Sequence, residues 1–357
     1  MFFQDVPPVK MAERQMPHPY ADNPHQCRTV HRVYPRRDFT AETGRKGFTV
    51  KAGCHVPVMC AEMIEALAPQ GDGVYFDGTV GAGGYTEALL QASGPSGRVI
   101  GVDMDETAVL RCGRRFLEYG DRVRLFHAGY HEVGAVLTEL GIRTIHGAVL
   151  DLGLSSDQLH DAARGFSFQT AGPLDMRFDT SRGESVSKYL QRLSVNELEE
   201  ILATYGEERY CKKLARAISA EVQRGGVETT RDLVRIVERL LGTRRGKIHP
   251  ATRIFQALRI AVNREVDNLR LGLELIPQYL AEGARFCVVS YHSLEDREVK
   301  VSFRGRARER GTWRVVTPKP LRPTGAEVLN NPRARSARMR VLEALVQDPG
   351  ENRRLEP

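Results

Sequence analysis

Between about residues 55 and 156, the apolar positions follow strand and helix periods in turn. Short apolar runs typical of buried strands lie at 74–77, 99–103, 123–127 and 147–151. Amphipathic stretches typical of helices lie at 57–67, 86–91, 106–117 and 133–140. Strands that alternate with helices of this length predict a parallel sheet covered on both faces. We therefore predict an α/β fold whose strand ends, Asp77, Asp103, His127 and Asp151, line one edge.

This alternation stops after residue 156. Helical patterns such as 195–202 and 230–241 take over, and Thr229 or Thr230 is a candidate N-cap of the second. A helix at 255–275, a strand at 285–290 and a helix at 292–303 then resume the earlier pattern. The predicted organisation is a core of residues 51–156 and 252–340, interrupted by an all-helical insertion at 157–251. Residues 1–50, which are rich in proline and lack apolar periodicity, predict a flexible extension, and 341–357 a tail.

Composition indicates a globular protein. Of the 357 residues, 41% are hydrophobic and 27% are charged, and no run of 18 apolar residues predicts a membrane span. The six cysteines are scattered, without a Cys-x-x-Cys pair. We therefore expect a cytoplasmic protein with neither a disulfide framework nor a metal site.

Positive charge is concentrated near the C-terminus. Residues 297–340 contain thirteen Lys or Arg and three Asp or Glu, a local charge of +10 within a net charge of +7. A basic segment beside a cofactor fold is consistent with a polyanionic partner such as nucleic acid. The alternative, a solvated arginine-rich segment, stays open on charge alone.

A glycine-rich turn follows the first predicted strand. Residues 77–84 read Asp-Gly-Thr-Val-Gly-Ala-Gly-Gly, and Asp103 follows Gly84 by nineteen residues. Glycines let the backbone approach a ligand, and an acid after the second strand can accept hydrogen bonds from ribose hydroxyls. The carboxylate of Asp77 would repel a pyrophosphate but would suit a ligand that carries an ammonium and a sulfonium. S-adenosylmethionine is therefore favoured, with an NAD-dependent oxidoreductase as the alternative.

Further motifs carry a family resemblance. They lie at 150–159, 165–177, 204–209, 249–259, 290–297 and 331–336. From His55 to about Arg340 the chain resembles the cytosine-N4 methyltransferases of ribosomal small-subunit RNA, the RsmH/MraW family. The resemblance implies a class I S-adenosylmethionine-dependent methyltransferase, with a Rossmann-like doubly wound sheet and a helical insertion for substrate recognition. It also implies methylation of the N4 amine of a decoding-centre (P-site) cytidine of 16S ribosomal RNA. Assembled small subunits are the expected substrate, with free RNA as the alternative, and the protein acts as a monomer or a homodimer.

The same resemblance implies the cofactor contacts. Asp103 would hold the ribose, Tyr130 would pack by the adenine, and Asp151 would lie near the methionine end. Tyr85 stands where the commoner family pattern has histidine. A contact through the backbone would survive this change, whereas a contact specific to the ring would not. The full implied set is Gly83, Gly84, Tyr85, Asp103, Tyr130, Asp151 and Gln158.

The sequence offers three candidates for the group that accepts the amine proton. DNA amine methyltransferases carry Asp/Ser-Pro-Pro-aromatic after the fourth strand, whereas this chain has Asp151-Leu-Gly-Leu there. The missing prolines and aromatic residue disfavour a DNA amine methyltransferase, so the acceptor must come from elsewhere. The candidates are Ser155, Asp175 and His292. Simpler interpretations are an ion pair between Asp175 and Arg177 and a helix cap by His292.

Overall fold

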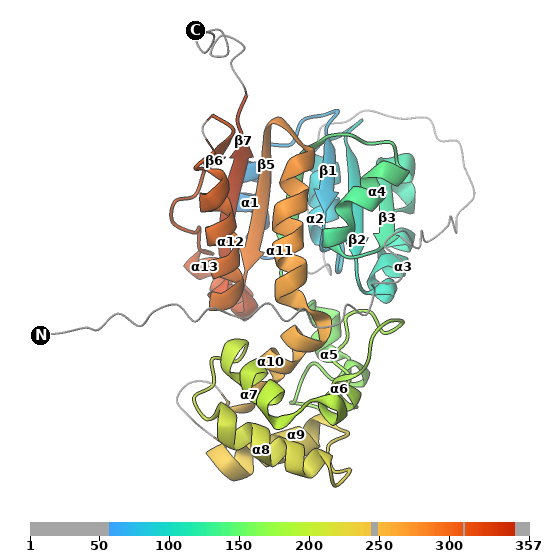
Figure 1. Ribbon diagram of the computed structural model, residues 1–357. Coiled ribbons are helices and arrows are strands. Elements are labelled where there is room, and N and C mark those ends of the chain that lie inside the picture. Colours follow the sequence, from blue (N-terminus) through green and yellow to red (C-terminus); the bar gives the residue numbers. More distant parts are fainter. Residues whose placement is uncertain (1–56, 244–248, 310, 347–357) are drawn as a thin grey trace, which may run out of the picture.

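The computed structural model describes residues 57–243, 249–309 and 311–346 (Figure 1). The extension predicted at 1–50, the expected start of the core at 51–56 and the last residues of the tail lie outside this part. No helix in the described ranges is long and apolar enough to cross a membrane.

A seven-stranded sheet forms one half of the molecule, in the order β3-β2-β1-β4-β5-β7-β6. Strands β1 to β5 run parallel, β7 is antiparallel to β5, and β6 is antiparallel to β7. The strand order reverses between β1 and β4, which places a topological switch point at their carboxyl ends. The strands are Val74–Asp77, Arg98–Asp103, Val123–His127, Ile145–Asp151, Leu280–Ser290, Trp313–Val315 and Arg338–Ala344, numbered β1 to β7.

Helices cover both faces of the sheet, as Figure 1 shows. One face packs against α4 (Val133–Glu139), α11 (Glu265–Leu275) and α12 (Ser293–Arg306) in a single hydrophobic cluster. The other packs against α1 (Cys60–Leu67), α2 (Gly84–Ala92) and α3 (Glu106–Arg115). Because both faces are covered, β1 has no exposed residue, which explains its unbroken apolar run. The predicted doubly wound α/β sheet is confirmed.

A second hydrophobic cluster forms the centre of a helical unit below the carboxyl edge of the sheet in Figure 1. This unit contains α5 (Ser156–His160), α6 (Val186–Arg192), α7 (Val195–Thr204), α8 (Cys211–Val222), α9 (Thr230–Leu241) and α10 (Ala251–Asn263). Thr229 caps α9 through a reciprocal pair of hydrogen bonds with Asp232, one of the two caps expected. The remaining short elements are α13 (Gly325–Asn330), η1 (Leu117–Arg122), η2 (Tyr130–Glu132), η3 (Ala162–Arg164), η4 (Ile276–Tyr279) and η5 (Pro332–Ser336).

Two boundaries differ from those expected. The helix predicted at 255–275 is broken at Arg264, which has a φ of 52°. Its first half, α10, packs within the helical unit, and its second half, α11, packs on the sheet. Strand β7 runs on to Ala344, so residues 341–344 belong to the sheet, where Val341 and Leu342 are fully buried. Their apolar side chains fill the space beneath α12 and η5, although the segment around them is rich in proline and arginine.

Candidate active site

Three carboxylates lie at the carboxyl ends of neighbouring strands: Asp77 on β1, Asp103 on β2 and Asp151 on β4. Burial raises the pKa of Asp77 and of Asp103 to about 6, and that of Asp151 to about 7. None of the three forms an ion pair with another described residue. This edge therefore holds uncompensated negative charge, which favours a cationic ligand.

Both carboxylate oxygens of Asp77 accept hydrogen bonds from residues that follow it in the chain. Its carboxylate accepts hydrogen bonds from the Thr86 hydroxyl at 2.6 Å and from the backbone N–H of Thr79 at 3.1 Å, and it is fully buried. It therefore fixes the start of α2 against the end of β1, and its complete burial separates it from the partly exposed Asp103.

Packing explains two of the glycines in the turn. A Cβ at Gly83, where φ is +84°, would lie 2.7 Å from the Phe116 ring, and one at Gly84 would lie 2.8 Å from Pro57. At Gly81, by contrast, the nearest side-chain atom would be the Cβ of Ser155, at 3.9 Å. The turn thus packs closely on one side and stays open towards Ser155 on the other.

Asp103 holds the same turn in place. Its carboxylate accepts the backbone N–H of Gly81 at 2.7 Å and that of Asp105 at 2.8 Å. Each oxygen keeps a second lone pair, so the group can still accept hydrogen bonds from a diol.

The side chain of Tyr85 is buried within the fold, close to Asp151 and Tyr291. It is buried between α1 and α2, and its hydroxyl donates to the backbone carbonyl of Val58. Only the backbone of Tyr85 remains at the start of α2, where a ligand could meet it.

We expect Tyr85→Phe to lower the stability of the fold and leave cofactor affinity unchanged. The substitution removes a buried hydrogen bond to Val58, which costs about 1–3 kcal/mol when the partner stays unsatisfied. Thermal unfolding and calorimetric titration with S-adenosylmethionine measure the two effects. A tenfold loss of affinity in a folded variant would instead assign the phenol ring to the cofactor.

Asp151 is anchored by residues from two other elements. Its Oδ1 accepts the Tyr291 hydroxyl at 2.7 Å, and its backbone N–H donates to the Thr79 hydroxyl at 2.7 Å. Sequence reasoning assigned no role to Tyr291. The available signal was its position directly after β5, at the edge where Asp151 ends β4.

His292 caps α12. Its Nδ1 accepts the backbone N–H of Glu295 at 3.4 Å, and its Nε2 lies 2.8 Å from Glu295 Oε1 in an alignment that forms no hydrogen bond. Burial raises the pKa of Glu295, but its hydrogen bonds and its neighbours His292 and Arg259 outweigh burial, and the net pKa lies below the usual range. An ionised, buried carboxylate therefore stands beside the imidazole, which follows directly after Tyr291.

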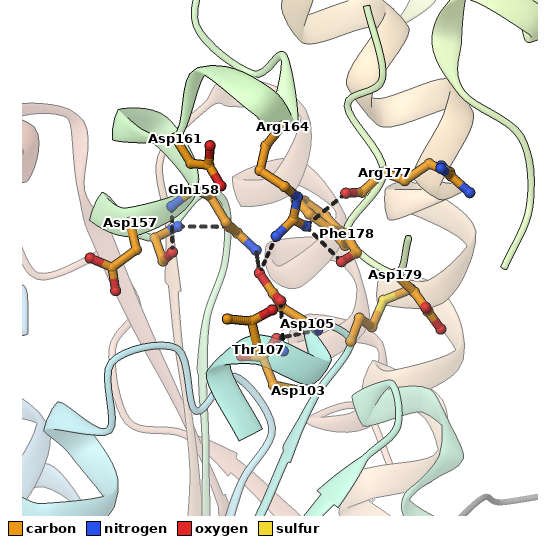
Figure 2. A network of polar contacts seen from close by, with 12 residues as sticks. Asp103, Asp105, Thr107, Asp157, Gln158, Asp161, Arg164, Arg177, Phe178 and Asp179 are labelled. Carbon is orange, nitrogen blue, oxygen red and sulfur yellow. Dashed lines mark hydrogen bonds and ion pairs between the residues drawn. The ribbon is translucent and has the colours of Figure 1, made fainter. Parts of the chain in front are cut away.

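Ser155 and Gln158 form the capping box of α5. Gln158 Oε1 accepts the Ser155 N–H at 3.0 Å, and the Ser155 hydroxyl accepts the Gln158 N–H at 3.2 Å. The Gln158 amide then donates to Asp105 Oδ2 at 3.1 Å, as Figure 2 shows. The capping box thus connects the end of β4 to the turn after β2.

Arg164 ties the sheet to the helical unit at the same place (Figure 2). Its guanidinium donates to Asp105 Oδ2 at 2.7 Å and to the backbone carbonyls of Arg177 and Phe178 at 2.9 and 2.8 Å. A second tie joins His127 Nε2, at the end of β3, to Asp179 Oδ2 at 3.3 Å. The hydrogen bond that His127 donates to Asp179 raises the pKa of His127, so this pair is favoured in its charged form.

Asp175 lies within an ion pair. Arg177 donates to its two oxygens at 2.9 and 2.8 Å. Burial opposes ionisation of Asp175, but the hydrogen bonds and charge of Arg177 outweigh it and lower its pKa. The structure thus brings Ser155 and His292 to the carboxyl edge, and it holds Asp175 in the loop of the helical unit.

Tyr130 lies where the third strand passes into α4. Its ring packs so closely on α11 that a Cβ at Gly272 would lie 2.6 Å from it. Burial, together with the nearby charges of Glu265 and Glu295, raises the pKa of its hydroxyl. Tyr130 therefore closes one side of the switch point with an aromatic face held by α11.

Some arginines of the basic segment form hydrogen bonds or ion pairs within the fold. Arg340 is buried on β7 and donates to Asp296 of α12 at 2.7 Å, and Arg338 reaches the same carboxylate at 3.3 Å. Arg333 donates to the Ser156 hydroxyl. Arg340 is therefore neither solvated nor available to a phosphate, whereas Arg335 is exposed.

Comparison with known proteins decides the family. The MraW methylase family model matches residues 52–345. The chain belongs to this family. It is 43% identical over 308 residues to the ribosomal RNA small subunit methyltransferase H of Thermomicrobium roseum, covering 82% of this chain and 94% of that protein. The Sorangium cellulosum protein of the same name is 46% identical over 287 residues, covering 80% and 89%. The crystal structure of an rRNA methylase from Streptococcus thermophilus is 13% identical, with a TM-score of 0.37, and covers 80% of this chain and 94% of that one.

Membership in the MraW methylase family confirms the resemblance predicted from the sequence, and it makes this protein a methyltransferase that uses S-adenosylmethionine. The edge fits that cofactor. The open side of the glycine turn at Gly81, the spare lone pairs of Asp103 and the uncompensated charge of Asp151 match a nucleoside that carries a sulfonium and an ammonium.

We expect the affinity of this MraW-family protein for S-adenosylmethionine to rise with pH. Because burial raises the pKa of Asp151 to about 7, this carboxyl is mostly neutral at pH 6 and ionised at pH 8. A cationic ligand binds the ionised form, so the dissociation constant should fall about tenfold between these pH values and then level off. Calorimetric titration measures this dependence.

The matched control is Asp151→Asn. It should lose the pH step near 7 and bind about 10–100-fold more weakly at pH 8, the loss expected for a charge-assisted hydrogen bond. Equal wild-type affinities at pH 6 and pH 8 would contradict the assignment of Asp151 to the cationic end of the cofactor.

Proposed function

We propose that the protein methylates the exocyclic N4 amine of a decoding-centre cytidine in 16S ribosomal RNA. The observation that carries this proposal is the family match along residues 52–345, joined to relatives named ribosomal RNA small subunit methyltransferase H. The buried carboxylates at the switch point support it independently, because they favour a sulfonium donor over a dinucleotide. The substrate would be the small ribosomal subunit, which places the reaction in the cytoplasm.

The cofactor roles follow from the contacts at the edge. Asp103 would accept the ribose hydroxyls, and the backbone at Gly83, Gly84 and Tyr85 would lie against the methionine part. Asp151 would face the charged end, with its carboxylate oriented by Tyr291. Gln158 would close the site from α5 while it bonds Asp105. The ring of Tyr130 would pack by the adenine.

Methyl transfer to this amine depends mainly on how the enzyme aligns the amine with the methyl group. A cytosine N4 amine is a weak nucleophile because its lone pair is delocalised into the ring, whereas bound S-adenosylmethionine supplies a strongly electrophilic methyl group. Holding the amine in line can contribute about 7–11 kcal/mol. A group that accepts the amine proton typically adds about 10²–10⁴-fold.

Of the three predicted acceptors, His292 is the one that we assign to this role. Its Nε2 faces the buried, ionised Glu295, which would stabilise the imidazolium, and the proton would go to Nδ1, whose 3.4 Å contact with the Glu295 N–H would then be given up. Ser155 is a very weak base, because a serine hydroxyl does not take up a proton near neutral pH. Asp175 is also a weak base, because its ion pair with Arg177 lowers its pKa. Ser155 and Asp175 would then serve to position the loops around the target base.

Methylation of purified small subunits tests the proposal. The protein, S-adenosylmethionine and subunits isolated from cells that lack this protein are incubated, and the nucleosides of the 16S RNA are analysed by mass spectrometry. We expect N4-methylcytidine at a single position. Methylation of another nucleoside would refute the proposed substrate, and no methyl transfer to subunits or to free 16S RNA would refute the proposed reaction.

A further inference from the structure

A group of exposed cations lies at the start of α8, in the helical unit. Lys212, Lys213 and Arg216 are spaced so that they share one face of the helix, and Arg209 lies in the turn just before it. All four side chains are exposed. We call these four residues the α8 basic face.

The α8 basic face has no counter-charge within the part of the chain that the structure describes. Among the described residues, no carboxylate forms an ion pair or hydrogen bond with any of its four members. The cations beside it are paired: Arg235 contacts Asp232, and both Arg224 and Arg239 contact Glu221 at the other end of α8. Positive charge is therefore concentrated on one half of one helix.

These cations do not stabilise α8. The first turn of α8 contains no acidic residue, although cations near a helix N-terminus are unfavourable by a few tenths of a kcal/mol each. Cations in this unfavourable position, with no compensating contact among the described residues, are expected where a surface serves function rather than folding.

An aromatic side chain lies among these cations. Tyr210 is 38% exposed, and the Arg209 guanidinium lies 5.8 Å from the centre of its ring. Basic side chains beside an exposed aromatic ring suit RNA, because phosphates pair with the cations and an unpaired base can stack on the ring. An acidic protein would use the charges but not the ring.

The α8 basic face lies away from the carboxyl edge. In Figure 1, α8 is at the far side of the helical unit from the sheet. A single nucleotide bound at Asp103 and Asp151 therefore does not reach it, whereas a folded RNA that extends along the helical unit can contact both places.

We propose that the α8 basic face is a second docking surface for the substrate RNA, which binds phosphates remote from the methylated cytidine. This inference rests on the proposed function and adds to it a contact that the reaction at the sheet does not require. Affinity for RNA then depends on α8, while cofactor binding and the chemical step do not.

The test replaces Lys212, Lys213 and Arg216 together with glutamine, which keeps a high helix propensity. We expect the KM for small subunits to rise about tenfold or more, with unchanged kcat at saturation and unchanged affinity for S-adenosylmethionine. Binding to 16S RNA should also lose about 0.7–0.9 units of salt slope for each phosphate contact removed.

The matched control replaces Arg224, Arg235 and Arg239 with glutamine. It removes the same charge from neighbouring positions whose cations are already paired, so we expect a near-wild-type KM and salt slope. An α8 variant with wild-type KM and salt slope would overturn the proposal, and so would an equal loss in both variants, because net charge alone would then explain it. If the wild-type protein transferred no methyl group, the proposed function would fail, but the two variants would still test RNA binding by α8.

Discussion

His292→Asn should lower kcat about 10²–10⁴-fold, the contribution expected of a group that accepts the substrate proton. Asparagine is a good helix N-cap and can accept the Glu295 N–H as histidine does, so α12 should keep its start. The amide cannot take up a proton near neutral pH. We therefore expect normal thermal stability and normal affinity for S-adenosylmethionine alongside the loss of turnover.

Two features separate this chemical role from a structural one. The loss should fall on kcat, while the KM for small subunits should stay near the wild-type value. The control His249→Asn changes another histidine beside a glutamate, with His249 Nε2 3.2 Å from Glu238, in the helical unit. It should leave kcat near the wild-type value. A His292→Asn variant that turns over within a factor of three of wild type would remove His292 from the reaction.

Arg164→Ala should lower the stability of the protein by about 3–5 kcal/mol, the usual cost of removing one member of a buried ion pair. The substitution leaves Asp105, which is 7% exposed, without its cation, and it frees the carbonyls of Arg177 and Phe178. Because Asp105 follows Asp103 on the same turn, the cofactor site should also loosen, with weaker binding of S-adenosylmethionine.

Thermal unfolding with and without S-adenosylmethionine measures both effects of Arg164→Ala. We expect a fall in Tm of about 10 °C and a smaller stabilisation by the cofactor. Arg164→Lys should recover only part of the loss, because one ammonium cannot reproduce the fork that binds three oxygens. Arg192→Ala is the control, since that arginine is 66% exposed in its pair with Glu184 and should cost less than about 1 kcal/mol. Equal Tm values for the Arg164→Ala and Arg192→Ala variants would show that the contact in Figure 2 contributes little.

The sequence predicted the parallel sheet and its functional edge because both depend on local periodicity. Asp77, Asp103 and Asp151 each follow a short apolar run, and parallel strands bring such ends together whatever the rest of the chain does. The helical unit could also be predicted from the sequence, since its helices have amphipathic faces and caps such as Thr229.

The spacing of hydrophobic and polar residues could not predict contacts between segments that are far apart in the sequence. Tyr291 and Asp151 lie 140 residues apart, and Arg164 and Asp105 lie 59 apart, so neither pair has a local signal. The direction of Tyr85 also escaped prediction, because its position after the glycines is compatible with either side of the turn until α1 packs there. The break at Arg264 was hidden because apolar positions continue in phase through α10 and α11, although the two helices pack in different clusters.

The central claim is that the carboxyl edge of the sheet binds a sulfonium donor rather than a dinucleotide. Parallel calorimetric titrations of the full chain with S-adenosylmethionine and with NAD, in wild type and in Asp151→Asn, test it most directly. We predict saturable binding of S-adenosylmethionine that weakens about 10–100-fold in the variant, and no binding of NAD. Binding of NAD in place of S-adenosylmethionine would contradict the account. Equal affinities of the wild type and the Asp151→Asn variant for S-adenosylmethionine would also contradict it.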